Sequence, residues 1–141
     1  MVIEIPLADK DNANKKKLAL LIVDDNKNFR SVLKRVMDEY PQISEVAEAG
    51  NANEMFAQIG DALPDIVIMD VSMPGMDGFD ATKKLLSRHK SVKVIILTIY
   101  DTDEYRKRAK ESGAMTYIVK QDVVTKLDAT LNSIFRQRGL L

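Results

Sequence analysis

The stretch Leu18–Asp25 reads LALLIVDD, six apolar residues followed at once by two carboxylates. A short, nearly continuous apolar run is typical of a strand in a parallel sheet that is covered on both faces. The pattern returns at Ile66–Asp70, IVIMD, where a carboxylate again follows the run. Both stretches therefore predict buried strands that deliver acidic side chains to the point where the strand ends.

Three further short runs, Glu45–Ala49, Val94–Leu97 and Met115–Val119, extend this pattern along the chain. Five strand–helix repeats favour a parallel sheet with right-handed crossovers, so we predict an α/β fold, doubly wound, with strand order 2-1-3-4-5. Glu45–Ala49 carries two glutamates and is expected at an edge. Between the runs, apolar residues recur at helical spacing: Phe29, Val32, Leu33, Val36 and Met37, and then Val124, Leu127, Leu131, Ile134 and Phe135.

Short polar residues precede the predicted helices. Their side chains can accept hydrogen bonds from the first backbone amides of a helix. Gly113 follows a polar helix and suits a left-handed C-terminal cap. The predicted N-caps are Asn26, Asn51 or Asn53, Asp101 and Asp122.

Composition sets the limits for function. The 141 residues include 21 basic and 21 acidic side chains, so no overall charge attracts this chain to nucleic acid or to an anionic membrane. Without cysteine there is neither a disulfide nor a thiolate metal site. No signal peptide and no apolar run of about 20 residues is present, and we expect a cytoplasmic protein. The expected organisation is a leader at 1–17, one domain at 18–138 and a tail at 139–141.

Five chemically active side chains stand at the ends of the predicted strands: Asp24, Asp25, Asp70, Thr98 and Lys120. The predicted strand order brings them to one edge of the sheet, where ligands bind in doubly wound folds. Carboxylates packed together repel one another, and a divalent cation would relieve that repulsion. Oxygen ligands without soft donors select a hard ion, so the pattern indicates Mg²⁺.

A bound Mg²⁺ suggests phosphoryl transfer, which needs mainly positioning and neutralisation of charge. Asp70 is the predicted nucleophile, because a carboxylate can form an aspartyl phosphate. Lys120 and the Thr98 hydroxyl would each contact a phosphate oxygen. Asp25 and Asp70 would hold the metal, with Asp24 bound to it directly or through water.

Four motifs carry a specific resemblance: the pair Asp24-Asp25, MDVSMPGMDG at Met69–Gly78, LT at Leu97-Thr98 and YIVK at Tyr117–Lys120. In this order, at successive strand ends, they resemble the response-regulator receiver domain of two-component signal transduction, over residues 18–137. The resemblance implies a flavodoxin-like (β/α)5 fold. It also implies a signalling domain that catalyses only its own phosphorylation and dephosphorylation.

The resemblance assigns further roles. Asp70 would be the phosphoacceptor, the backbone carbonyl of Ser72 a metal ligand beside Asp24, Asp25 and Asp70, and Mg²⁺ the cofactor. Thr98 and Tyr117 would form a switch that changes the surface of the fourth helix, fifth strand and fifth helix. A sensor histidine kinase or phosphotransfer protein would supply the phosphoryl group, and a downstream protein or linked output domain would respond. Contact with nucleic acid or membrane by this domain is not expected, and dimerisation on phosphorylation stays open.

Two positions depart from the family pattern. Gln121 follows the lysine where the family often has proline, so the loop is expected to be either trans or strained. Ile99, followed by Tyr100, stands where the family usually has a small residue. These two side chains would crowd the phosphate, which predicts slow dephosphorylation.

Two other functions share part of this residue pattern. A Mg²⁺-dependent phosphohydrolase with an aspartyl-phosphate intermediate favours a second acid two residues after its nucleophile, where this chain has Ser72. That enzyme class also uses a cap segment to enclose its substrate, and the sequence predicts no such segment. A receiver-like binding module that is never phosphorylated would not need the full acidic and cationic set.

Overall fold

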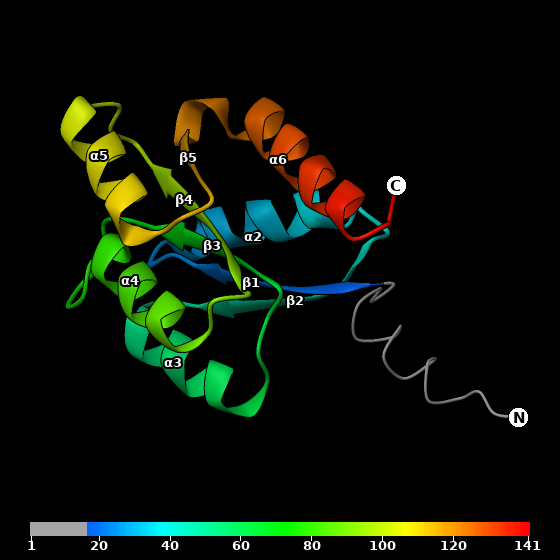
Figure 1. Ribbon diagram of the computed structural model, residues 1–141, viewed down its shortest axis with the longest axis horizontal. Coiled ribbons are helices and arrows are strands. Elements are labelled where there is room, and N and C mark those ends of the chain that lie inside the picture. Colours follow the sequence, from blue (N-terminus) through cyan, green and yellow to red (C-terminus); the bar gives the residue numbers. More distant parts are fainter. Residues whose placement is uncertain (1–16) are drawn as a thin grey trace, which may run out of the picture.

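Five parallel strands form one sheet in the computed structural model, which describes residues 17–141 (Figure 1). The strands are β1 (Leu18–Val23), β2 (Ile43–Ala49), β3 (Ile66–Asp70), β4 (Lys93–Thr98) and β5 (Thr116–Val119). The helices are α2 (Lys27–Met37), α3 (Ala52–Asp61), α4 (Gly78–Arg88), α5 (Asp103–Ser112) and α6 (Val123–Gln137), with a 3₁₀ turn, η1, at Lys120–Asp122.

The strand order is β2-β1-β3-β4-β5, with every neighbouring pair parallel. The predicted fold class, strand order and edge position of the second strand are therefore confirmed. Of the predicted leader, residues 1–16 lie outside the described residues, and Lys17 is exposed.

Two apolar clusters hold the layers together, one on each face of the sheet. Leu20 and Ile22 of β1 pack into the cluster beneath α2 and α6, whereas Leu21 and Val23 pack into the cluster beneath α3, α4 and α5. This alternation follows from the period of two along a strand. Figure 1 shows the same layers, with α2 and α6 on one side of the sheet and α3 and α4 on the other. Because both faces are covered, the strand ends are left as the place for polar chemistry.

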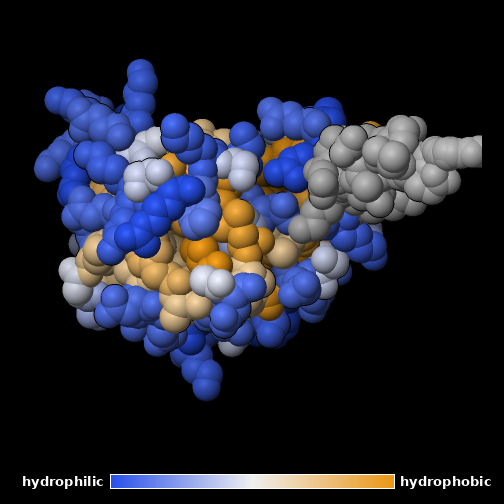
Figure 2. All heavy atoms as spheres, turned by 60° about the horizontal axis from the view of Figure 1, so that its bottom comes forward, coloured by the Kyte–Doolittle hydropathy of each residue, from blue (hydrophilic) through white to orange (hydrophobic). Residues whose placement is uncertain are grey.

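Apolar surface also stays exposed on the side that carries α3 and α4, where Figure 2 shows it ringed by polar side chains. On this side a groove of about 240 Å³ lies between the starts of β1 and β2 and the end of α3. Small residues, Ala19 and Ala47, contribute to its wall together with Leu63. The groove lies at the amino ends of the strands, opposite the ends that carry Asp24 and Asp70.

Helix caps agree with the prediction at three positions. The side chain of Asn26 accepts a hydrogen bond from the Phe29 amide at 3.0 Å, and that of Asn51 accepts one from Glu54 at 2.9 Å. Gly113 ends α5 with φ of 90°, the left-handed conformation that glycine adopts without strain. Of the two candidate caps for α3, Asn51 and Asn53, the structure therefore shows Asn51 as the N-cap.

Of the other two predicted caps, Asp101 is wrong, and Asp122 has the predicted position without the predicted bond. Thr102, not Asp101, caps α5, because its hydroxyl accepts the Tyr105 amide hydrogen at 3.1 Å. Asp122 precedes α6 but makes no capping bond. The 3₁₀ turn runs directly into α6, and the amide of Val123 donates to the carbonyl of Lys120 instead.

The predicted apolar faces of α2 and α6 are each one residue too wide. Val32 is 49% exposed and Val124 is 73% exposed, although both fit the helical spacing. Val32 lies about 100° around the helix from the buried Leu33, which turns it away from the sheet. Val124 follows Val123, which packs against the cluster beneath α2 and α6, and therefore lies about 100° around the helix from that contact. Within the described part of the chain, no helix is long and apolar enough to cross a membrane.

Candidate functional site

The parallel register gathers the predicted side chains at one edge of the sheet. Val23 of β1 pairs with Met69 of β3, so the next residues, Asp24 and Asp70, leave neighbouring strands together. Asp70 in turn pairs with Leu97, one residue before Thr98 on β4. Thr98 pairs with Val119 on β5, the residue before Lys120. The predicted convergence of strand ends is therefore present in the structure.

Three carboxylates form a compact cluster at this edge. Asp24, Asp25 and Asp70 each offer one oxygen, and these oxygens all lie within 4.8 Å of one another. Asp24 and Asp70 are only 2% and 5% exposed, whereas Asp25 is open to solvent. A donor set made only of carboxylate oxygens, open on one side to water, fits Mg²⁺, which prefers oxygen ligands and keeps several waters.

Lys120 bridges the two buried carboxylates. Its Nζ lies 3.0 Å from Oδ2 of Asp24 and 3.3 Å from Oδ1 of Asp70, and the side chain is 20% exposed. Burial alone would lower the pKa of this ammonium, but the hydrogen bond to Asp24 and the charges of both carboxylates raise it above its usual value. Lys120 therefore stays charged beside the acidic cluster.

The cluster is electrostatically unfavourable for Asp70. Burial raises the pKa of the Asp70 carboxyl from 3.8 to about 6, and the charges of Asp24 and Asp25 add to this rise. The charge and hydrogen bond of Lys120 act in the opposite direction without cancelling it. One ammonium is thus too little for three carboxylates, and a divalent cation has the charge to balance the rest.

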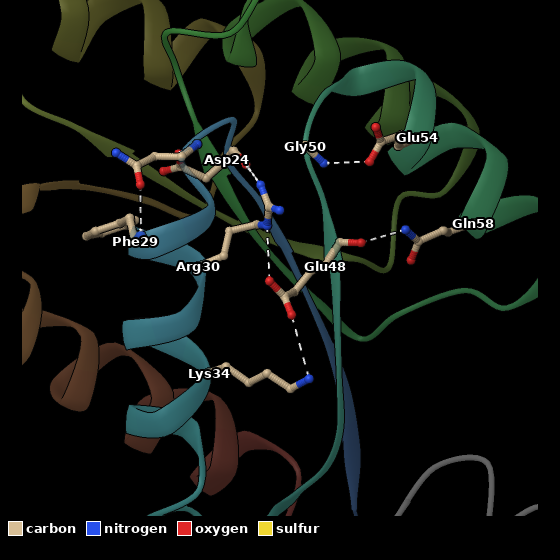
Figure 3. A network of polar contacts seen from close by, with 9 residues as sticks. Asp24, Phe29, Arg30, Lys34, Glu48, Gly50, Glu54 and Gln58 are labelled. Atoms are coloured by element: carbon tan, nitrogen blue, oxygen red, sulfur yellow. Dashed lines mark hydrogen bonds and ion pairs between the residues drawn. The ribbon is translucent and has the colours of Figure 1, made fainter.

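A network of charged side chains holds the acidic loop in place (Figure 3). Arg30 of α2 donates from Nη1 to the carbonyl of Asp24 at 2.5 Å and from Nε to Oε1 of Glu48 at 3.0 Å. Lys34 also pairs with Glu48, at 3.6 Å. The amide of Asn26 donates to Oδ1 of Asp24 at 2.8 Å. The loop after β1 is therefore tied both to α2 and to the edge strand β2.

Sequence reasoning missed Arg30. Its side chain is only 15% exposed and contacts the backbone of Asp24, yet a lone arginine on a helix with other basic residues does not stand out. Its ion-pair partner, Glu48, lies 18 positions further along the chain on another element. Only the packing of α2 against β2 brings the two residues together, and no local pattern reports that contact.

Thr98 and Tyr117 both contact the backbone of Tyr100. The buried Thr98 hydroxyl accepts a hydrogen bond from the Tyr100 amide at 3.1 Å. The Tyr117 hydroxyl donates to the carbonyl of the same residue. A hydroxyl has one proton to donate, and the Thr98 proton is not used in its bond with Tyr100. Tyr100 therefore links the strand-end threonine to the half-buried tyrosine on β5.

The loops after β3, β4 and β5 differ in how exposed and how closely packed their residues are. Ser72, after β3, is exposed, as is Ile99, at 64%. Gly78 approaches the strand end so closely that a Cβ atom there would lie 2.1 Å from the carbonyl oxygen of Asp70. The Lys120–Gln121 peptide bond is trans, which decides between the two expected loop forms.

Comparison with known proteins supports the resemblance to the receiver domain family. The family model for the response regulator receiver domain matches residues 20–132. The transcriptional regulatory protein DegU of Brevibacillus brevis is 31% identical over 79% of this chain and 47% of its own length. Response regulator GacA of Pseudomonas viridiflava is 30% identical over 84% of this chain and 55% of its own length. The chain thus spans about half the length of the curated relatives it matches.

Solved structures agree as well. A LuxR-family two-component response regulator from Aurantimonas sp. SI85-9A1 superposes with a TM-score of 0.73 and 28% identity, covering 83% of this chain and 86% of that one. The family match covers most of the chain, and the strand-end geometry fits it. The chain therefore belongs to the response regulator receiver domain family of two-component signalling.

Proposed function

We propose that Asp70 is the residue of this receiver domain that accepts the phosphoryl group. The observation that carries this proposal is the position of Asp70: it is buried at a strand end, within 4.8 Å of two further carboxylates and 3.3 Å from the Lys120 ammonium. Both carboxylate oxygens of Asp24 are engaged, Oδ1 by the Asn26 amide and Oδ2 by Lys120, whereas Lys120 contacts only Oδ1 of Asp70. Asp25 is exposed, and no hydrogen bond or ion pair of the described residues holds it. Asp70 is thus the carboxylate best placed for attack.

In the proposed step, a carboxylate oxygen of Asp70 attacks the phosphorus of a phosphohistidine. An oxygen–phosphorus bond forms, the phosphorus–nitrogen bond breaks, and the imidazole leaves with the electron pair and takes up a proton. Lys120 holds one phosphoryl oxygen through a charge-assisted hydrogen bond, and the Thr98 hydroxyl donates to another. The donor would be a sensor histidine kinase or a phosphotransfer protein.

Mg²⁺ would be held by Asp24, Asp25, Asp70 and the backbone carbonyl of Ser72, the group implied by the family resemblance. When bound, the ion neutralises charge on the phosphoryl oxygens and on the carboxylates. Asp25 is open to solvent, which fits an ion that retains water. The residues of this chain thus supply both an anionic cradle and, through Lys120, a cation next to it.

The proposed response runs from Thr98 to Tyr117. If the Thr98 hydroxyl turns towards the phosphoryl group, its bond with the Tyr100 amide is lost, and the Tyr117 contact with Tyr100 changes with it. Tyr117 lines a groove of about 470 Å³ together with Arg106 of α5 and Lys126 of α6. A partner on the α5–β5–α6 surface would therefore sense the state of Asp70.

We assign the receiver domain to residues 18–138 and place it in the cytoplasm. This chain spans about half the length of those relatives, which supports a linked output domain as one possible responder. A separate downstream protein is the other. We propose no reaction beyond self-phosphorylation and self-dephosphorylation. A phosphohydrolase is disfavoured because Ser72 stands where that class favours a second acid.

Intact-mass measurement tests this function directly. The protein would be incubated with Mg²⁺ and acetyl phosphate, and its mass compared with that of Asp70→Asn and of a control, Asp61→Asn, on the exposed end of α3. We expect one added phosphoryl group in the wild type and in the control, and none in Asp70→Asn. A folded wild type that gains no mass, or an Asp70→Asn variant that gains it, would refute the assignment.

A further inference from the structure

The ammonium of Lys120 has a third neighbour besides its two carboxylates. Its Nζ lies 4.3 Å from the centroid of the Phe29 ring, well inside the range of about 6 Å over which a cation is attracted to an aromatic face. Asp24 and Asp70 hold the same ammonium by ion pairs. Lys120 is therefore enclosed by two carboxylates and one aromatic ring.

Local structure places Phe29 there. Asn26 caps α2 by accepting the Phe29 amide hydrogen, and the amide of Asn26 donates to Asp24. Figure 3 shows the result, with Phe29 on the first turn of α2 beside the loop that carries Asp24. Side chains of a helix tilt towards its N-terminus, which here faces the strand ends. The loop that carries the first acids thus also sets the position of the ring.

Lys120 needs such support in this chain. Its side chain is long and flexible, and the residue begins a 3₁₀ turn with a trans bond to Gln121 instead of the proline typical of the family. Phosphorylation of Asp70 would also change one of its two ion-pair partners. The ring contact uses no hydrogen-bond acceptor, so it persists whichever oxygen the ammonium binds.

We propose that Phe29 is a positioning residue for Lys120: its ring face holds the ammonium in place for the phosphoryl oxygen. This proposal rests on the proposed function of Asp70 and Lys120. A partly exposed cation–π contact corresponds to about a two- to fivefold change in a rate or equilibrium constant. Loss of the ring should therefore slow phosphorylation by about this factor.

Three variants separate this role from a packing role. Phe29→Leu removes the aromatic face, and Phe29→Tyr keeps it. Tyr40→Leu is the matched control, because Tyr40 is also a partly buried aromatic residue in the α2–α6 cluster but follows the opposite end of α2. For each protein, the rate of phosphorylation by acetyl phosphate would be measured at saturating Mg²⁺.

A second readout is the NMR shift of the Lys120 side chain, since a group above an aromatic ring is shifted upfield by the ring current. We expect Phe29→Leu to lose this shift and to react about two- to fivefold more slowly, and Phe29→Tyr to retain both properties. Tyr40→Leu should leave the Lys120 shift and the rate unchanged.

The possible outcomes are distinct. The proposal is overturned if Phe29→Leu reacts at the wild-type rate, if Phe29→Tyr is as slow as Phe29→Leu, or if Tyr40→Leu slows the reaction equally. A wild type without the upfield shift of Lys120 would also overturn it. A wild type that takes up no phosphoryl group would overturn the function of Asp70 and, with it, the role of Phe29.

Discussion

Replacing Asp70 with asparagine is expected to stabilise the metal-free protein, although it abolishes the proposed reaction. Burial and the charge of Asp24 raise the pKa of Asp70 from 3.8 to about 6. A rise of about two units corresponds to about 3 kcal/mol against the ionised carboxylate in the folded state. Asparagine removes that charge but also the ion pair with Lys120. We therefore expect about half of this amount, roughly 1–2 kcal/mol, as a gain in the free energy of unfolding.

The sign of the pH dependence follows from linkage. A carboxyl group with a raised pKa binds its proton more tightly in the folded state, so ionised Asp70 destabilises the fold above about pH 6. This destabilisation shrinks as the pH falls from about 6 towards 3.8, because the carboxyl becomes protonated. The advantage of Asp70→Asn should therefore be largest near neutral pH and small at about pH 4.

Urea unfolding followed by circular dichroism measures this difference, with a chelator present, at about pH 7.5 and about pH 4. Asp61→Asn serves as the control, because this exposed change should alter stability by no more than about 0.5 kcal/mol. Added Mg²⁺ should narrow the gap by stabilising the wild type more than the variant. A variant less stable than the wild type near neutral pH, or a gap that does not change with pH, would refute the electrostatic reasoning.

Three further changes test other contacts of the site. Arg30→Ala should lower the free energy of unfolding by about 1–3 kcal/mol and weaken Mg²⁺ binding in calorimetry, because the acidic loop loses a charged donor; unchanged Mg²⁺ affinity would count against it. Gly78→Ala should lower the free energy of unfolding in urea by about 1–3 kcal/mol, because the new Cβ would lie 2.1 Å from the Asp70 carbonyl oxygen. The control Gly60→Ala, with open space around the new Cβ, should not destabilise the protein. Ile99→Ala should shorten the lifetime of the aspartyl phosphate, followed by mass spectrometry, because a smaller side chain lets water reach the phosphate; an equal or longer lifetime would contradict this.

The convergence of the site residues was predictable, because it depends only on the lengths of the apolar runs and on the order of the strands in the sheet. Parallel strands of similar length end at one edge, so the residue type that follows each apolar run decides what gathers there. Asp24, Asp70 and Thr98 needed no knowledge of packing. Their spacing in the sheet follows from the fixed separation of neighbouring strands.

Contacts across elements were not predictable in this way. Arg30 and Phe29 lie on the same helical turn, but one faces β2 and the other faces Lys120. Which face of α2 meets which neighbour depends on the rotation of the helix against the sheet. Val32 illustrates the same point, because the helical spacing places it on the buried face whereas the structure leaves it exposed. The apolar pattern of a helix does not show how that helix is rotated against the sheet.

In the proposed switch, the Thr98 side chain would turn and exchange one hydrogen bond for another, which would let a small chemical change at Asp70 alter a distant surface. The hydroxyl accepts one neutral hydrogen bond from the Tyr100 amide, worth about 1 kcal/mol. A bond from the same hydroxyl to a phosphoryl oxygen is charge-assisted and worth about 1.5–3 kcal/mol. The difference is about 0.5–2 kcal/mol, enough to change the ratio of the two states by a factor of about 2 to 30. Tyr117 holds the carbonyl of the same Tyr100, so in the proposed switch the α5–β5–α6 surface would follow this ratio.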